Sequence, residues 1–177
     1  FLSPEQGNRR VNILALADVA DLRSIVPLSN LLKKDRRRVD PETSAWIMGR
    51  LLKLLSFVHA EGVANRAMMA NNVLLDPDQH FAITLDWSVA RVFPSTVPAE
   101  HAATDIKMAA TAVFSALGGS VANNSWPYEG HEPYIALLRQ LMLTGAPDAD
   151  KALDAFYATV RAEYGQSFHP FTTLSLT

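Results

Sequence analysis

The sequence predicts a mainly α-helical domain with a small β-hairpin. Apolar residues recur at helical spacing through most of 41–62, which is typical of a helix buried on one side. Two β-prone runs, 73–75 and 81–87, flank a DPDQH turn and favour a hairpin. From residue 105 onward the periodic segments are helical, so helices should outweigh strands.

The first forty residues give the weakest indications of secondary structure. Residues 9–16 (RRVNILAL) are β-prone and predict one strand. Residues 22–28 predict an extended connector, or at best an edge strand, because Pro27 has no backbone N–H to donate. Ser29 is a suitable N-cap for a short helix of sequence SNLLKK.

The helix after residue 40 is the clearest element. Asp40 is a good N-cap, and Pro41 occupies the first helical position, where a missing N–H costs nothing. Gly62 is expected to end the helix in the left-handed conformation. One buried stripe is predicted from its spacing: Ile47, Leu51, Leu54, Leu55 and Val58.

The second half of the chain predicts three more helices. Residues 88–103 are expected to be irregular because they contain two prolines. Residues 105–117 are apolar almost all round and predict a central buried helix. Further helices are expected at 133–144 and at 148–164, with Asp148 at the start of the last one.

Composition excludes several classes of protein. The 177 residues favour one domain, and 49% apolar with 19% charged residues is typical of a soluble globular protein. The absence of cysteine excludes disulfides, zinc–thiolate sites and cysteine nucleophiles. No apolar run reaches the roughly 18 residues that a membrane span needs. The chain begins with Phe1 without a signal-like segment, so we expect an intracellular, cytoplasmic protein or a piece of one.

A basic cluster, KKDRRR, stands out from the net charge of -2. We expect a solvated loop between two helices, with a patch for an acidic partner such as nucleic acid as the alternative. Its basic residues are Lys33, Lys34, Arg36, Arg37 and Arg38.

Four motifs follow one another at characteristic spacings. A helix ends in HAEG at 59–62, and the loop NRAMMANN follows at 65–72. The hairpin then leads to DWS at 86–88, and DIKMAATAVFSALGG follows at 105–119. This order resembles the large lobe of the protein-kinase-like superfamily, where a loop H-R-D-L-x-x-x-N precedes a hairpin and D-F-G.

The resemblance covers roughly residues 9 to 165 and implies a division of the chain. Residues 1–28 would be a residual small-lobe strand and a hinge-like connector. Residues 29–177 would be a kinase-like large lobe, so the small lobe is absent except for one strand.

The resemblance also assigns roles to single residues. Asn65 takes the place of the loop histidine, Arg66 matches the arginine, and Ala67 replaces the catalytic aspartate. Asn72 has the spacing of the metal-binding asparagine, and Asp86 stands for the aspartate of D-F-G. These two could hold Mg²⁺; the alternative is that Asn72 satisfies loop backbone and Asp86 caps a turn.

Three further expectations concern the surroundings of this loop. Asp105 would be buried and would accept backbone N–H groups of the loop. Arg66 should form a local ion pair or stack on Trp87. Met68 and Met69 should pack in the core or line the cleft, with a partner-binding groove as the alternative.

The departures from the family favour a protein that is not an enzyme. Phosphoryl transfer needs an anionic group to orient the acceptor hydroxyl, and Ala67 cannot supply one. Before Arg9 there is no glycine-rich loop, strand lysine or partner glutamate, so we expect no cofactor beyond weak Mg-ATP. We interpret the chain as a pseudokinase-like module that binds, regulates or scaffolds a protein partner. Two alternatives stay open: a phosphotransferase whose small lobe lies outside this chain, and an architectural domain.

Overall fold

The structure is a computed structural model, and it describes residues 2–3, 9–10, 25–33, 38–76, 81–120, 122–123 and 125–166. The backbone alone is described for 2–3, 9–10 and 31–33. Its helices are α1 (Leu28–Lys33), α2 (Pro41–Ala60), α3 (Ala99–Ala116), α4 (Glu132–Thr144) and α5 (Ala149–Tyr164). Its strands are β1 (Leu2–Ser3), β2 (Arg9–Arg10), β3 (Val26–Pro27), β4 (Val63–Ala64), β5 (Val73–Asp76), β6 (Phe81–Thr84) and β7 (Arg91–Val92).

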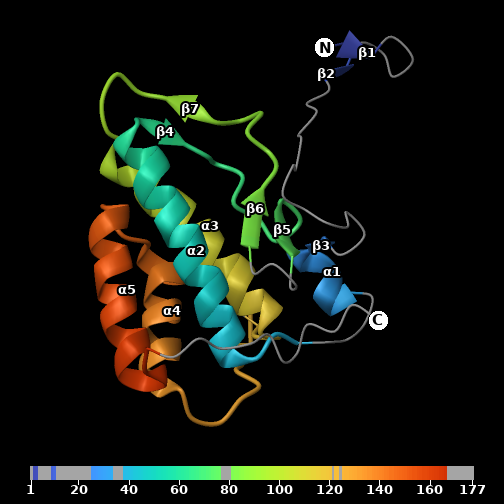
Figure 1. Cartoon of the computed structure of the whole chain (residues 1–177), viewed down its shortest axis with the longest axis vertical. Coiled ribbons are helices and arrows are strands. Elements are labelled where there is room, and N and C mark those ends of the chain that lie inside the picture. Colours follow the sequence, from blue (N-terminus) through green and yellow to red (C-terminus); the bar gives the residue numbers. More distant parts are fainter. Residues whose placement is uncertain are drawn as a thin grey trace.

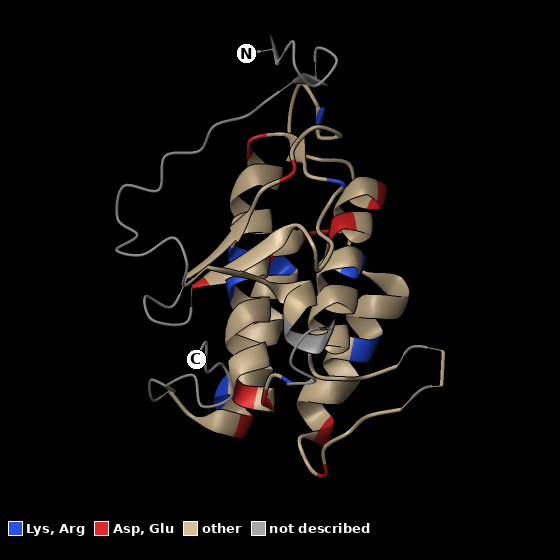
Figure 2. Cartoon of the chain, turned by 90° about the vertical axis from the view of Figure 1, so that its right-hand side faces the viewer, with Lys and Arg blue, Asp and Glu red and all other residues tan. Residues whose placement is uncertain are grey.

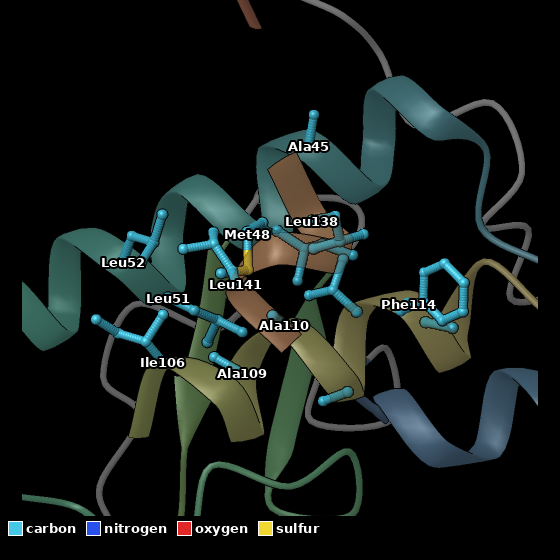
Figure 3. Close-up of a cluster of buried hydrophobic side chains, with 14 of the residues drawn as sticks. Ala45, Met48, Leu51, Leu52, Ile106, Ala109, Ala110, Phe114, Leu138 and Leu141 are labelled. Atoms are coloured by element: carbon cyan, nitrogen blue, oxygen red, sulfur yellow. The ribbon is translucent and has the colours of Figure 1, made fainter. Parts of the chain in front are cut away.

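The long helices form the body of the molecule. Helix α2 packs against α3 and α5, and α4 packs against α3 and α5 (Figure 1). Side chains of α2, α3 and α4 meet in one apolar core (Figure 3). The labelled core residues include Met48, Leu51, Ile106, Ala109, Leu138 and Leu141. The predicted mainly α class with a small antiparallel sheet is therefore confirmed.

The small sheet lies against the helices and has the order β3–β5–β6. Strands β5 and β6 pair antiparallel, with Val73 opposite Thr84 and Asp76 opposite Phe81, so the predicted hairpin is confirmed. The expected 81–87 strand is too long, because the ladder ends at Thr84 before the chain turns. Strand β3 pairs along β5 as an edge strand, the more ordered of the two forms expected for 22–28; residues 22–24 lie outside the described residues.

Helix α2 begins and ends where its sequence predicts. The carboxylate of Asp40 accepts a hydrogen bond from the backbone N–H of Thr43 at 2.9 Å, as an N-cap does. Gly62 follows the helix with a φ of 73°. A Cβ atom there would lie 2.2 Å from the carbonyl oxygen of Ser95, so only glycine fits. Of the predicted stripe, Ile47, Leu51 and Leu55 are buried, and Leu54 and Val58 are half-buried against the same core.

Several boundaries correct the sequence-based prediction. Helix α3 begins at Ala99, well before Asp105, because Pro98 adopts a φ of -59° that starts a helix rather than interrupting one. The supposedly irregular segment also contains β7, which pairs antiparallel with β4. Helix α1 begins at Leu28, so Ser29 lies inside it and is not its N-cap. Helix α5 does have Asp148 as its N-cap.

The structure describes only parts of the N-terminal strand and the basic cluster. Of the strand expected at 9–16, residues 9–10 form β2, and the rest lies outside the described residues. Arg38 is exposed, and its side chain lies over Gly118. Lys34, Arg36 and Arg37 lie outside the described residues, and of Lys33 only the backbone is described.

Charged residues of both signs are spread over the described surface. Figure 2 shows basic and acidic positions interspersed along several helices. None of the described helices combines the length and the apolar character that crossing a membrane requires.

Candidate functional site

The loop that joins β4 to β5, residues 65–72, is anchored on one carboxylate of α3. Asp105 is fully buried. Its Oδ2 accepts a hydrogen bond from the backbone N–H of Asn65 at 2.8 Å, and its Oδ1 accepts one from the backbone N–H of Arg66 at 2.7 Å. The Nε2 of His59, from the end of α2, lies 3.0 Å from Oδ2 and donates to it, since a carboxylate only accepts. The expected contact of Asp105 with the loop backbone is therefore present, and His59 adds to it.

Asn65 ties this loop to the chain that leaves β6. Its side chain is fully buried. The Oδ1 atom accepts a hydrogen bond from the backbone N–H of Ala67 at 3.0 Å, and the Nδ2 atom donates to the backbone carbonyl of Asp86 at 3.1 Å. Sequence reasoning treated Asn65 only as the residue in the histidine position, because nothing local reveals a carbonyl twenty-one residues away. In the structure it connects the two segments that form the site.

Ala67 lies at the centre of the loop and is 2% exposed. Its carbonyl oxygen accepts a hydrogen bond from the Nδ2 of Asn72 at 2.9 Å. The backbone N–H of Leu85 donates to the carbonyl of Asn72 at 3.0 Å, which extends the β5–β6 pairing by one position. This bond places Asp86 next to the residue opposite Asn72. The fold thus brings Asn65, Ala67, Asn72 and Asp86 together at one end of the hairpin, and Asn72 satisfies loop backbone.

Asp86 caps the turn that follows β6. Its Oδ1 accepts hydrogen bonds from the backbone N–H of Ser88 at 2.9 Å and from the Ser88 hydroxyl at 2.6 Å. Both bonds lower the pKa of Asp86 below its ordinary value. The bond from the Ser88 hydroxyl has the larger effect, and the bond from the Ser88 backbone N–H has the smaller. Asp86 is therefore an ionised carboxylate at neutral pH.

Two oxygen atoms remain as ligands for a cation at this end of the hairpin. Within the described residues, no hydrogen bond engages the Oδ2 of Asp86 or the Oδ1 of Asn72. Mg²⁺ prefers six oxygen ligands in octahedral geometry, so a cation held here would keep most of its water. In the described part of the chain, no group of three or more histidine, aspartate or glutamate side chains is arranged to hold a metal ion.

Arg66 differs from its expected role. It is exposed, and its backbone has a φ of 63°, which is unfavourable for a residue with a side chain. The bond from its N–H to Asp105 holds this conformation. Among the described residues its guanidinium forms neither the predicted ion pair nor the predicted stack on Trp87. The Trp87 ring instead donates its Nε1–H to the carbonyl of Thr84 at 3.1 Å.

The two methionines of the loop have opposite environments. Met68 is fully buried in the main core, whereas Met69 is 46% exposed. Met69 lines a groove of about 390 Å³ between the loop and α3, together with Met108. Leu85 and Val89, on the chain that leaves β6, are also exposed. We call Met69, Leu85 and Val89 the apolar rim of the site.

A comparison with protein-family models finds no match to this chain, and a comparison with curated proteins finds no relative.

Proposed function

We propose that this chain is a catalytically inactive, kinase-like module that binds or regulates a protein partner. The observation that supports this most is Ala67, which lies buried at the centre of a loop whose backbone is anchored on Asp105. In phosphoryl transfer a carboxylate at this point orients the acceptor hydroxyl and takes its proton. A methyl group can do neither.

Two described carboxylates, Asp105 and Asp86, lie near the loop, and hydrogen bonds hold both in other roles. Asp105 is buried, and both of its oxygens accept hydrogen bonds. Asp86 is bound to Ser88 and stands where the family places a metal ligand. The Asp105 side chain thus holds the loop backbone next to Ala67, and the Asp86 side chain holds the turn at Ser88.

The groups that bind the phosphates of a nucleotide are also incomplete in this chain. The loop carries one cation, Arg66, and its side chain is exposed. The sequence before Arg9 contains neither a glycine-rich loop nor a strand lysine to hold the phosphates. A nucleotide held only through Mg²⁺ on Asn72 and Asp86 would sit in water, where each charge contact is worth around 1 kcal/mol.

The apolar rim supports a protein partner. Met69, Leu85 and Val89 are 46%, 37% and 49% exposed and lie on the two segments that Asn65 connects. Methionine adapts to irregular apolar surfaces, and interfaces are enriched in it. A partner that covers this rim would take the place of the nucleotide-binding lobe of active kinases.

A second function is favoured by the two available oxygen ligands. The Oδ1 of Asn72 and the Oδ2 of Asp86 would suit the Mg²⁺ site of a phosphotransferase whose small lobe lies outside this chain. Such an enzyme would need a general base at another position, because the methyl group of Ala67 cannot accept a proton.

Radiolabelled ATP distinguishes the two functions. We expect no Mg²⁺-dependent transfer of the γ-phosphate to the chain or to generic protein substrates. The Asp86→Asn variant is the matched control, because it removes the negative charge of the metal ligand and keeps the shape of the side chain. Stoichiometric labelling that disappears in Asp86→Asn would establish the enzyme and contradict the binding module.

A further inference from the structure

One face of α3 carries a groove beside the loop at 65–72. The opposite face of this helix, with Ile106, Ala109 and Phe114, points into the core (Figure 3). The groove has a volume of about 390 Å³, and Met69 and Ala70 of the loop form its second wall. We call it the α3 groove.

The groove follows one stripe of α3. Met108, Thr111, Ala112 and Ser115 line it at positions i, i+3, i+4 and i+7, which is the spacing of a single helix face. These positions span about 10 Å along the helix axis, the length of two turns of a helix that lies alongside. Alanine and serine are small enough for a partner helix to approach closely, and Met108 can adapt to its shape.

The loop backbone beside the groove is already hydrogen-bonded within the chain. The N–H of Met69 donates to the carbonyl of Ala67 at 2.7 Å, and the carbonyl of Met69 accepts from the N–H of Asn72 at 2.8 Å. The carbonyl of Ala70 accepts from the backbone N–H of Ser29 at 3.0 Å. These described residues therefore offer no strand edge to extend. A segment bound here has to satisfy its own backbone, as an α-helix does.

The charge at the groove favours an acidic helix. Lys107 lines the groove, and in the described part of the chain it pairs with no carboxylate. None of the described lining residues is acidic, and the hydroxyl of Thr111 already donates to the carbonyl of Lys107 at 2.7 Å. Arg66, on the same loop as Met69, is a second exposed cation. A carboxylate on the partner would meet an unpaired positive charge at this place.

We propose that the α3 groove binds one acidic amphipathic helix of a protein partner. Apolar side chains spaced i, i+4 and i+7 on that helix lie along the α3 stripe and against Met69, and a glutamate beside them pairs with Lys107. This inference rests on the proposed binding function, because Met69 also belongs to the apolar rim, and it specifies the chemistry of the partner.

Selection from a peptide library on the full chain tests the proposal. The probes are displayed helical peptides in which the residues of one face and its flanks are randomised. We expect the enriched peptides to carry apolar residues at i, i+4 and i+7 with an excess of glutamate and aspartate on the flanks. In titration calorimetry such a peptide should bind as one equivalent.

Two pairs of variants locate the bound peptide. Met69→Gln keeps the length of the side chain and removes its apolar character, so it should weaken binding about fivefold. Leu143→Gln, at an exposed position of α4 outside the groove, is its control and should change nothing. Lys107→Glu should weaken the acidic peptide about fivefold and strengthen a counterpart with lysine in place of glutamate. Lys53→Glu, on the exposed face of α2, should alter neither affinity.

Several results would overturn the proposal. These are unchanged affinity in Met69→Gln or in Lys107→Glu, enrichment of basic or non-helical peptides, and the absence of any enriched peptide. If Met69→Gln does not fold, Lys107→Glu decides alone. The ATP-labelling measurement is independent: a chain that transfers no phosphate and binds no helix in the α3 groove refutes this inference only, whereas Mg²⁺-dependent labelling refutes the inactive module.

Discussion

Replacing Asp105 by alanine should destabilise the protein strongly, because three donors converge on this one buried carboxylate. The backbone N–H groups of Asn65 and Arg66 and the Nε2 of His59 lie 2.8, 2.7 and 3.0 Å from its oxygens. A buried donor that loses its acceptor costs about 1–3 kcal/mol. Arg66 is exposed, so water can replace part of its bond. We therefore expect a loss of roughly 2–4 kcal/mol in the free energy of unfolding.

Urea unfolding followed by circular dichroism measures this loss. In a domain of this size 1 kcal/mol shifts the Tm by about 2–4 °C, so Asp105→Ala should melt roughly 5–15 °C below the parent. Thr104→Ala is the matched control on the same helix. The Thr104 hydroxyl is exposed, and its one hydrogen bond within the described residues goes to the carbonyl of Glu100, so this change should stay within about 0.5 kcal/mol.

The urea midpoints of Asp105→Ala and Thr104→Ala together show whether Asp105 anchors the loop at 65–72. If Asp105→Ala and Thr104→Ala unfold at the same urea concentration with unchanged slope, the carboxylate does not hold the loop. Asp105→Asn should fall between them, because an amide has one acceptor oxygen and cannot satisfy both Asn65 and Arg66.

Two further predictions concern the turns beside the site. Gly62→Ala should lower the free energy of unfolding by about 1–3 kcal/mol more than Gly165→Ala in urea titrations. Both glycines have positive φ, but only a Cβ on Gly62 would meet a backbone oxygen, at 2.2 Å from Ser95; equal losses would contradict the close approach. Ser88→Ala should raise the pKa of Asp86 toward its ordinary value, because the Ser88 hydroxyl is the main cause of the lowered pKa. A pKa lowered by folding stabilises the folded state above the unfolded pKa, and this contribution is lost as the pH falls through the folded pKa. An NMR titration of the Asp86 carboxyl carbon measures the change, and an unchanged pKa would show that the hydroxyl bond is not formed in solution.

Elements with local signals were predictable from the sequence. Helix α2 has its N-cap, its proline and its terminal glycine within or next to the helix, and the β5–β6 hairpin has its turn residues between the strands. Each signal acts over a few residues, so no knowledge of the tertiary structure is needed. The buried position of Asp105 followed from the resemblance, since its partners are forty residues away.

Features that depend on distant partners were not predictable. Strands β4 and β7 have two residues each, and only their pairing defines them. A proline such as Pro98 can either interrupt regular structure or begin a helix, and before α3 it begins one. The role of Asn65 depends on the carbonyl of Asp86, and the positive φ of Arg66 depends on the anchor at Asp105. In each case tertiary contacts decide between conformations that the local sequence leaves open.

Nucleotide binding by a restored loop tests the central claim most directly. Ala67→Asp together with Ser88→Gly returns the two kinase-like residues, but it supplies no group to grip the phosphates. Binding through Mg²⁺ alone in an open site should stay near millimolar affinity, or about 4 kcal/mol in all. The measurement is the Tm of the parent and of the double variant as Mg-ATP rises from micromolar to millimolar. We predict no shift at micromolar nucleotide in either protein, since stabilisation requires a ligand concentration above the Kd. A shift that saturates at micromolar Mg-ATP would show that this chain holds a complete nucleotide pocket, and would contradict the inactive binding module.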